Sequence, residues 1–304
     1  MSSVREVLPA CQWVSQQARH VKINHAKIPA YAGFILDRCR PVAGLDPSIH
    51  HVTDDPEETA AYILALDSIN FGSGYFDGRL EYATIAGGLK QAFEQGELNR
   101  PEKWVKAAAE DFSRLFSVPV NGLTALFAQH LRETGKKILA EYQGSVLNLL
   151  EQAGYSALKL ADIVAAWDSF QDAPFYKGRK IPFLKRAQIV AADMHLALPG
   201  FKDMDALTIF ADNMVPHVLR CDGIIEYDAS LAAKIDHGAC LPAGSEEEIE
   251  IRAAAIYAVE LIKQAAHRQG HAVTSVNLDH MLWHRGYEPE LYKKPRHRTL
   301  TTAY

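Results

Sequence analysis

The sequence predicts a mainly α-helical protein that forms a single compact domain over residues 1–304. Helix-start signals recur along the chain, and apolar residues follow them at helical spacing. Strand signals are weak, because the best candidate, residues 272–278, has a pattern that begins a helix equally well. No internal repeat and no long Gly/Ser/Pro linker divides the chain. With 48% hydrophobic residues, the chain has enough apolar surface for a core, which excludes a wholly disordered protein.

Three helical segments are expected in the first half of the chain. Residues 54–58 combine an acidic cap, an early proline and first-turn acids, so a helix is expected to follow them. Pro101 is expected to start a second helix. Between residues 123 and 150, apolar residues at helical spacing predict a long helical stretch that is broken at Gly135 and Gly144.

The second half contains three further helix predictions. Residues 183–198 read as a buried helix, which ends at a Pro-Gly pair. Residues 203–212 form a second, short helical candidate. Residues 245–248 have the spacing of a capping box, in which a serine and a glutamate satisfy each other's backbone amides. The helix expected after it, residues 249–266, is apolar on more than one face and should be central.

Charge and composition bound the class of protein. The formal net charge of −5 does not favour a protein that coats a nucleic acid, although it is compatible with a local basic pocket for one phosphate. The start of the chain lacks the apolar core of a signal peptide, and no run approaches the roughly 18 apolar residues of a membrane span. We therefore expect a cytoplasmic protein with no membrane partner. Its four sparse cysteines are expected to be reduced and mostly buried: Cys11, Cys39, Cys221 and Cys240.

Short catalytic motifs are absent from the sequence. It has no P-loop, no G-x-G-x-x-G, no H-E-x-x-H and no G-x-S-x-G, which argues against the enzymes that use them. Two histidine pairs have the spacing of one helix face: His280 with His284, and His267 with His271. Spacing alone does not supply the further ligands that a metal needs, so surface or hydrogen-bonding histidines are the favoured interpretation. We predict no metal and no cofactor.

Several segments have two readings on the residues alone. Residues 70–76 carry glycines and aromatics that suit a ligand wall, or equally a helix cap followed by aromatic core residues. Asp212 follows an apolar run and is either a cap or an acid in a cleft, and caps are commoner. Lys185 and Arg186, preceded by other basic residues, suit an anion or a solvated face. The basic tail, residues 295–304, reads by default as flexible and solvated.

Taken together, the segments resemble the queuosine salvage family, the queuosine 5′-phosphate N-glycosidases. The resemblance runs in order over roughly residues 50–304, and residues 1–50, a helical part, match more weakly. Each fragment is weak alone, and their shared order carries the match. The fragments are Asp67-Ser68-Ile69-Asn70-Phe71, Glu133-Thr134-Gly135-Lys136, Phe183-Leu184-Lys185-Arg186-Ala187-Gln188-Ile189 with Asp193, Phe210-Ala211-Asp212 with Val215-Pro216, Glu248-Ile249-Glu250-Ile251-Arg252, Leu278-Asp279 with Leu282-Trp283, and Pro295 with His297-Arg298 near a terminal tyrosine.

The resemblance implies release of the base queuine from queuosine 5′-monophosphate, leaving ribose 5-phosphate, for salvage into tRNA. It also implies a helical fold similar to that of the DNA glycosylases. The acid of the Phe-Ala-Asp motif, which works at the anomeric carbon in the family, corresponds to Asp212. A histidine at the base corresponds to His50, with His51 as the alternative. The full set of substrate-binding candidates is His50, Asn70, Phe71, Lys185, Arg186, Phe210, Asp279 and Trp283.

The chemistry fits these residue types. Departure of the base leaves positive charge on the ribose, which a carboxylate such as Asp212 would stabilise or attack. A 7-deazaguanine has carbon in place of N7, so protonation there cannot activate the leaving group. The chain departs from the family pattern at Gly72–Phe76 and at Asn213, Met214 and His217, which bears on the exact substrate. Two other functions stay open: an N-glycosidase or phosphorylase for another modified nucleoside, and a non-catalytic protein that binds queuine or contacts tRNA.

Overall fold

The structure is a computed structural model, and it describes residues 3–38, 44–73 and 80–304. The described residues contain 15 α-helices and only short two-stranded pairings, so the predicted mainly α class is confirmed. By their contacts the residues divide into two compact units. Unit 1 comprises Met1–Val42, Asp172–Lys185 and Met204–Thr301, and unit 2 comprises Ala43–Gln171, Arg186–Asp203 and Thr302–Tyr304. Neither unit is one continuous stretch of chain, and the organisation as a single domain stays a prediction.

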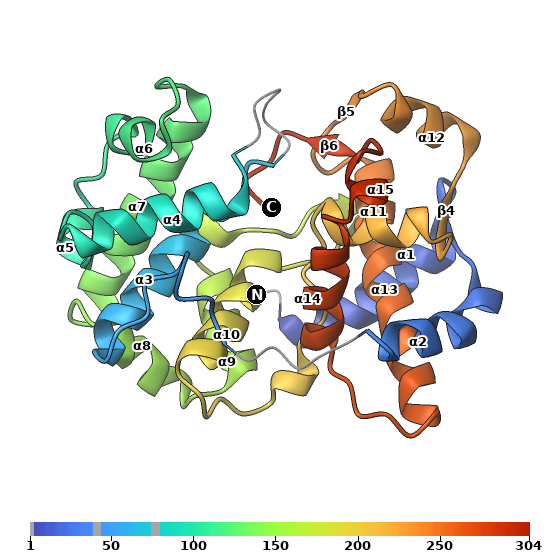
Figure 1. Ribbon diagram of the computed structural model, residues 1–304, viewed down its shortest axis with the longest axis horizontal. Coiled ribbons are helices and arrows are strands. Elements are labelled where there is room, and N and C mark those ends of the chain that lie inside the picture. Colours follow the sequence, from blue (N-terminus) through green and yellow to red (C-terminus); the bar gives the residue numbers. More distant parts are fainter. Residues whose placement is uncertain (1–2, 39–43, 74–79) are drawn as a thin grey trace. The chain divides into compact units, whose positions relative to one another are not determined.

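Unit 1 is built around one long helix, α13 (Glu246–Arg268), drawn in orange in Figure 1. Its buried residues lie on all sides of the helix, because other helices pack around it. This confirms that residues 249–266 are central. The helices in contact with α13 are α1 (Val7–Gln17), α2 (Ile28–Leu36), α11 (Met214–Cys221) and α14 (Ser275–Arg285).

Short elements complete unit 1. Strands β1 (Val21–Ile23) and β4 (Ile225–Tyr227) pair antiparallel, with Lys22 opposite Glu226. Strands β2 (Phe175–Tyr176) and β3 (Arg179–Lys180) form a second antiparallel pair, and β5 (Cys240–Leu241) pairs in parallel with β6 (Arg298–Thr299). The remaining elements are α12 (Ala229–Asp236), α15 (Pro289–Tyr292) and the 3₁₀ turns Val4–Glu6, His25–Lys27 and Met204–Ala206.

Unit 2 is a separate helical cluster with its own apolar core. Helix α3 is buried along almost its whole length and packs against α4, α7 and α8 (Figure 1). Helix α10 belongs to this unit from Arg186 onward. The elements are α3 (Pro56–Ser68), α4 (Tyr82–Glu94), α5 (Pro101–Trp104), α6 (Ala109–Phe116), α7 (Gly122–Glu141), α8 (Val146–Ala153), α9 (Ala157–Ala165), the 3₁₀ turn Asp168–Phe170 and α10 (Lys185–Ala197).

Most of the helix predictions in unit 2 are confirmed, with one correction. The side chain of Asp55 caps α3, and Pro101 begins α5. Gly144 separates α7 from α8. Gly135, however, does not break the helix, because α7 runs through it. A β-carbon at Gly135 would lie 2.9 Å from Cβ of Trp104, so the glycine is there to let α5 and α7 pack closely.

In unit 1, two expectations need correction. Residues 203–212 do not form a helix beyond one 3₁₀ turn, because backbone groups of residues 210 and 211 hydrogen-bond to side chains of other helices instead. Ser245 Oγ accepts from the N–H of Glu248, as expected, but the Glu248 carboxylate accepts from the N–H of Gly244 rather than from that of Ser245. The ambiguous segment 272–278 begins a helix, since Thr274 caps α14.

The cysteines and the tail also differ from expectation. Cys11, Cys221 and Cys240 are free thiols, but only Cys11 is buried. Cys39 lies outside the described residues. The tail does not lie free in solvent, because four of its residues are buried: Arg296, His297, Thr299 and Tyr304. Among the described helices, none is long and apolar enough to cross a membrane.

Candidate active site

Phe210 and Asp212 lie on an irregular segment of unit 1, residues 207–213, that runs between helices without forming one. The segment is almost entirely buried, so its backbone polar groups need partners. The N–H of Phe210 donates to Oδ1 of Asp279 on α14 at 2.8 Å. The next carbonyl, that of Ala211, accepts from Nε of Arg252 on α13 at 3.0 Å. Two helices of unit 1 therefore hold the segment through charged side chains.

Asp212 itself is half-buried, and its two carboxylate oxygens differ in their contacts. Oδ1 accepts from the N–H of Met214 at 2.7 Å and from that of Val215 at 3.3 Å, in the first turn of α11. Oδ2 has no hydrogen-bond partner in the part of the chain that the structure describes. The interpretation of Asp212 as a helix cap thus explains the position of Oδ1 but not that of Oδ2. The helix N-terminus orients the carboxylate and leaves the other oxygen available to a ligand.

A buried ion pair lies behind this segment. Nη1 and Nη2 of Arg252 donate to the two carboxylate oxygens of Asp172 at 2.9 and 2.7 Å, and both side chains are at most 3% exposed. Oδ2 of Asp172 also accepts from the N–H of Lys185, the first residue of α10, at 3.0 Å. Asp172 and Arg252 therefore connect the backbone at Ala211 to the backbone at Lys185.

Sequence reasoning gave no role to Asp172 or Arg252. A signal for Arg252 was present, because it is a charged residue on a helix that is apolar on several faces. A buried charge of that kind needs a partner of opposite sign. No comparable signal marks Asp172, which lies in an irregular stretch of polar and apolar residues.

Asp279 and Trp283 lie one turn apart on α14. Asp279 is 8% exposed and is brought together with Phe210 by the hydrogen bond described above. Trp283 is half-buried and packs edge-on against Tyr287, with ring centroids 4.9 Å apart. On the same helix, Nε2 of His280 lies 3.0 Å from Nε2 of His284. The described residues contain no group of three or more side chains arranged to hold a metal ion.

The remaining predicted residues belong to unit 2. The ring nitrogens of His50 lie 2.8 Å from the carbonyl of Asp46 and 2.9 Å from the hydroxyl of Tyr82. Burial lowers the pKa of His50, which favours the neutral imidazole. His51, the alternative, forms an ion pair with Glu58 at 3.2 Å. Asn70 is half-buried, and its side chain has no hydrogen bond within the described part of the chain, so its amide is open to a ligand.

Phe71 and Arg186 are packed into the interior of unit 2. The ring of Phe71 contacts those of Phe127 and His130, at centroid distances of 5.1 and 4.7 Å. The guanidinium of Arg186 lies 5.1 Å from the Phe71 ring and donates to the carbonyls of three residues: Asp67, Ser68 and Ser169. The aromatic-core reading of Phe71 fits this arrangement. Residues 74–76 of the expected ligand wall lie outside the described residues.

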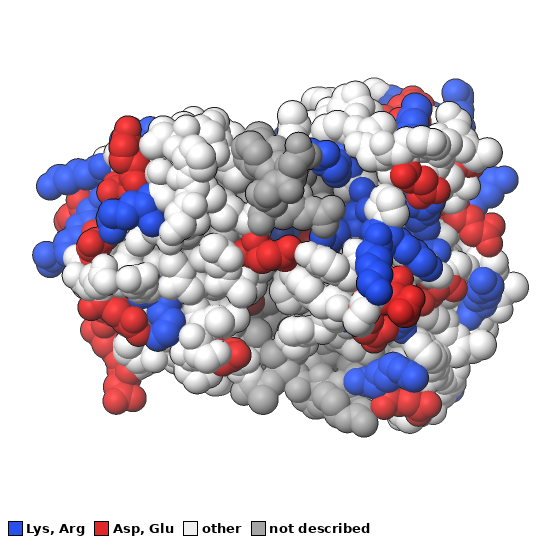
Figure 2. All heavy atoms as spheres, turned by 45° about the horizontal axis from the view of Figure 1, so that its top comes forward, with Lys and Arg blue, Asp and Glu red and all other residues white. Residues whose placement is uncertain are grey.

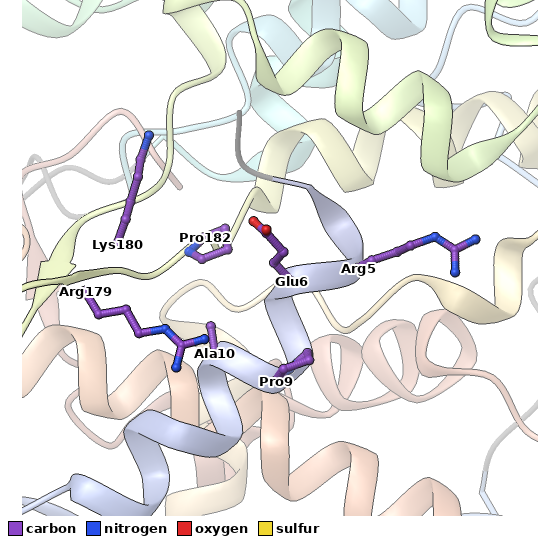
Figure 3. Close-up of a pocket in the computed structure, with 7 residues that line it drawn as sticks. All are labelled: Arg5, Glu6, Pro9, Ala10, Arg179, Lys180 and Pro182. Atoms are coloured by element: carbon purple, nitrogen blue, oxygen red, sulfur yellow. The ribbon is translucent and has the colours of Figure 1, made fainter.

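Unit 1 also has a surface hollow of about 230 Å³ that contains none of the predicted site residues. It lies between the start of α1 and the strand β3 (Figure 3). Its basic side chains do not converge, because Arg5 and Lys180 point away from it in different directions. Arg179 lies over the ring of Trp13, 5.1 Å from the centroid. The basic residues before Lys185 therefore do not form an anion site in this hollow.

Comparison with known proteins places these residues in a family. The family described as queuosine salvage protein matches residues 49–304. The chain belongs to this family. A queuosine salvage relative from Sphaerobacter thermophilus is 35% identical, over 98% of this chain and 97% of its own. The relative from Dictyostelium discoideum is 32% identical over the full length of both chains, and that from Mus musculus is 27% identical over 97% of each. All three are named queuosine 5′-phosphate N-glycosylase/hydrolase.

Proposed function

We propose that this queuosine salvage protein hydrolyses the N-glycosidic bond of queuosine 5′-monophosphate. Water adds to the anomeric carbon, the bond to the base breaks, and the products are queuine and ribose 5-phosphate. The observation that carries the proposal is the carboxylate of Asp212, which is oriented by a helix N-terminus through Oδ1 and has Oδ2 available. The names and nearly full-length match of the relatives support it.

Asp212 is proposed to act on the ribose. As the base leaves, the anomeric carbon becomes electron-poor, and a carboxylate oxygen held next to it stabilises that charge. Attack by Oδ2 on the same carbon, followed by hydrolysis of the ester, would give the same products. The two hydrogen bonds to Oδ1 serve either route, because they fix the carboxylate before the substrate binds.

The other residues of unit 1 are proposed to bind the substrate around Asp212. The Asp279 carboxylate suits the secondary ammonium of queuine, and the Phe210 and Trp283 rings suit its flat bicycle. For the 5′-phosphate we favour Lys185, a buried basic residue at the start of α10. Binding roles for four further residues stay predictions of the family resemblance: His50, Asn70, Phe71 and Arg186.

The proposal needs no cofactor and no stable complex with a nucleic acid. Lys and Arg side chains stand among Asp and Glu side chains on the face shown in Figure 2, and the net charge is −5. Such a surface favours a small phosphorylated ligand over a polyanion. We propose a cytoplasmic site of action, where nucleotides from tRNA turnover are found.

A product assay with Asp212→Asn tests the function. We expect the wild-type protein to release queuine and ribose 5-phosphate, identified by mass, and the variant to lose at least about 10³-fold in kcat. The variant should still bind the substrate in calorimetry. Asp205→Asn is the matched control, because Asp205 is exposed on the turn that precedes the same segment, and it should keep wild-type turnover.

The same assay separates the alternatives. Turnover of Asp212→Asn within threefold of wild type would remove Asp212 from the reaction. A sugar bisphosphate formed only with added inorganic phosphate would identify a phosphorylase instead. Binding of queuine with no sugar product from any nucleotide would identify a binding protein. Parallel reactions with queuosine and its 5′-phosphate measure which of the two is preferred.

A further inference from the structure

We propose that the buried pair Asp172–Arg252 is a positioning device for Asp212 and Lys185. The inference rests on the proposed function, because it assigns a role in the reaction at Asp212 to two residues that the proposed function does not use to bind the substrate. It concerns only unit 1, to which all four residues belong. Arg252 and Asp172 are positioning residues in this proposal, and Asp212 remains the group at the reacting carbon.

The geometry of the Arg252 guanidinium determines where its Nε donor points. A guanidinium is planar and rigid, so two hydrogen bonds to one carboxylate fix where its third donor group points. Here Nη1 and Nη2 both donate to Asp172, Nη1 also donates to Oε1 of Glu248 at 3.4 Å, and Nε donates to the carbonyl of Ala211. Cζ of Arg252 lies 4.0 Å from the centroid of the Phe183 ring, so this ring also packs against the guanidinium. The carbonyl of Ala211 belongs to the peptide group that leads into Asp212, so Arg252 sets the position of that residue's backbone.

Asp172 also holds the backbone of residues 183–185, which leads into α10. Its carboxylate accepts from the N–H of Lys185, and its own backbone carbonyl accepts from Phe183 and Leu184 at 3.0 and 3.3 Å. Leu184 has a φ of +55°, a left-handed conformation that leucine adopts only when its surroundings hold it there. Asp172 thus holds the turn that places Lys185 at the start of α10. The Asp172 carboxylate therefore holds the backbone next to Asp212 through Arg252, and it holds the backbone of Lys185 directly.

Stability alone is a weak explanation for this pair. A buried ion pair repays its desolvation only in part, and an apolar pair of similar volume often gives the same or greater stability. Apolar side chains, however, have no donor for Ala211 and no acceptor for Lys185. The distinctive contribution of Asp172 and Arg252 is therefore to orient the backbone at Ala211 and Lys185. Loss of this orientation should lower kcat.

Arg252→Lys is the first test, with Glu250→Gln as the matched control. Lysine keeps the positive charge, but it has neither the paired Nη1 and Nη2 donors nor the Nε donor of the guanidinium. Glu250 lies two residues earlier on the same helix, is equally buried, and accepts from the N–H groups of residues 19–21 and from Tyr176, away from the Asp212 segment. We expect Arg252→Lys to lower kcat about 10²-fold with KM within threefold of wild type. Both variants should lower Tm by a similar amount, but Glu250→Gln should keep kcat within threefold of wild type.

Asp172→Asn is the second variant, and it keeps the inference testable if Arg252→Lys does not fold. It preserves shape and one acceptor oxygen, and we expect kcat to fall about tenfold or more. Kinetics are measured at a temperature where circular dichroism shows every variant folded. Wild-type kcat in either folded variant would overturn the inference, as would an equal fall in kcat for Glu250→Gln. A wild-type protein that releases no queuine would instead overturn the proposed function.

Discussion

Each unit of the molecule contains a buried arginine that holds a segment carrying a predicted site residue. Arg252 of unit 1 is 1% exposed and donates to the carbonyl of Ala211, next to Asp212. Arg186 of unit 2 is 2% exposed and donates to the carbonyls at the end of α3, including that of Ser68, two residues before Asn70. In both units, a cation in the interior satisfies backbone carbonyls where regular structure stops.

The surroundings of the two guanidinium groups differ. Arg252 is paired with the buried carboxylates of Asp172 and Glu248, and its Cζ lies 4.0 Å from the centroid of the Phe183 ring. Arg186 lies between two aromatic rings, 5.1 Å from the centroid of Phe71 and 4.8 Å from that of Phe170. An ion pair gives a fixed direction, whereas aromatic faces tolerate small shifts. From this difference we expect the segment with Asp212 to tolerate less displacement than the segment with Asn70, and measurements of unfolding and of turnover test this expectation.

The largest expected effect comes from breaking the ion pair. Arg252→Met leaves the buried carboxylates of Asp172 and Glu248 without their shared cation, so the free energy of unfolding should fall by about 3–5 kcal/mol. Adding Asp172→Leu removes one of these two buried charges, and the double variant should regain at least about 1 kcal/mol. In unit 2, adding Phe170→Leu to Arg186→Met should destabilise further, because the ring is a packing partner and not a charge. Urea unfolding of the four variants measures each value.

Turnover distinguishes stability from positioning in the same variants. The double variant Asp172→Leu with Arg252→Met should stay as slow as the single Arg252→Met variant, although it is more stable. A double variant no more stable than Arg252→Met would mean that the two arginines are held in the same way.

The second prediction concerns a buried histidine next to each arginine. Burial, together with a smaller contribution from the nearby Arg252 and Arg186, respectively, lowers the pKa of His297 in unit 1 and of His130 in unit 2 to about 3. The ordinary value is 6.5, so between pH 6.5 and about 3 the unfolded chain binds a proton that the folded chain does not. Stability is therefore complete above pH 6.5 and falls with pH below it, by about 1.4 kcal/mol per pH unit for each histidine.

Variants that remove one histidine at a time measure this effect. His297→Gln and His130→Gln should each reduce the slope of unfolding free energy against pH by about one proton between about pH 6 and pH 4.5. Urea titrations at several pH values give the slope, which is independent of the cost of the substitution itself. An unchanged slope for either variant would show that the histidine is already protonated in the folded protein.

The parts of the fold that the sequence predicted correctly are those determined by residues close together in the chain, such as helix starts. Asp55 and Pro101 mark helix starts by chemistry that needs no tertiary partner. Residues 203–212 were misread as a helix, because the partners of their backbone, Asp279 and Arg252, lie far along the chain. Gly135 was misread as a break for the same kind of reason, since its role depends on the packing of α5.

The candidate site shows the same limit. The residue types on the Phe-Ala-Asp segment were sufficient to single out Asp212, and the family resemblance gave it a role. Local pattern offered the aromatic-core reading of Phe71, but it did not show that Arg186 would bind backbone carbonyls. Nor did it show the link from Ala211 through Arg252 and Asp172 to Lys185, which joins residues far apart in sequence. Such contacts depend on tertiary packing, which periodicity and capping signals do not encode.

The last prediction concerns the backbone next to the Phe71 ring in unit 2. Gly72 has a φ of +107°, and a β-carbon there would lie 2.7 Å from Cδ1 of the buried Leu123. Gly72→Ala should therefore cost about 2–3 kcal/mol, from backbone strain and overpacking together. Gly154→Ala is the control, because its φ is +62° and its β-carbon would meet nothing within 4 Å, so only about 1 kcal/mol of strain is expected. If the rings around Arg186 tolerate small shifts, Gly72→Ala should lower Tm while kcat stays within threefold. A tenfold or larger fall in kcat would show that this segment is held as exactingly as the one that carries Asp212.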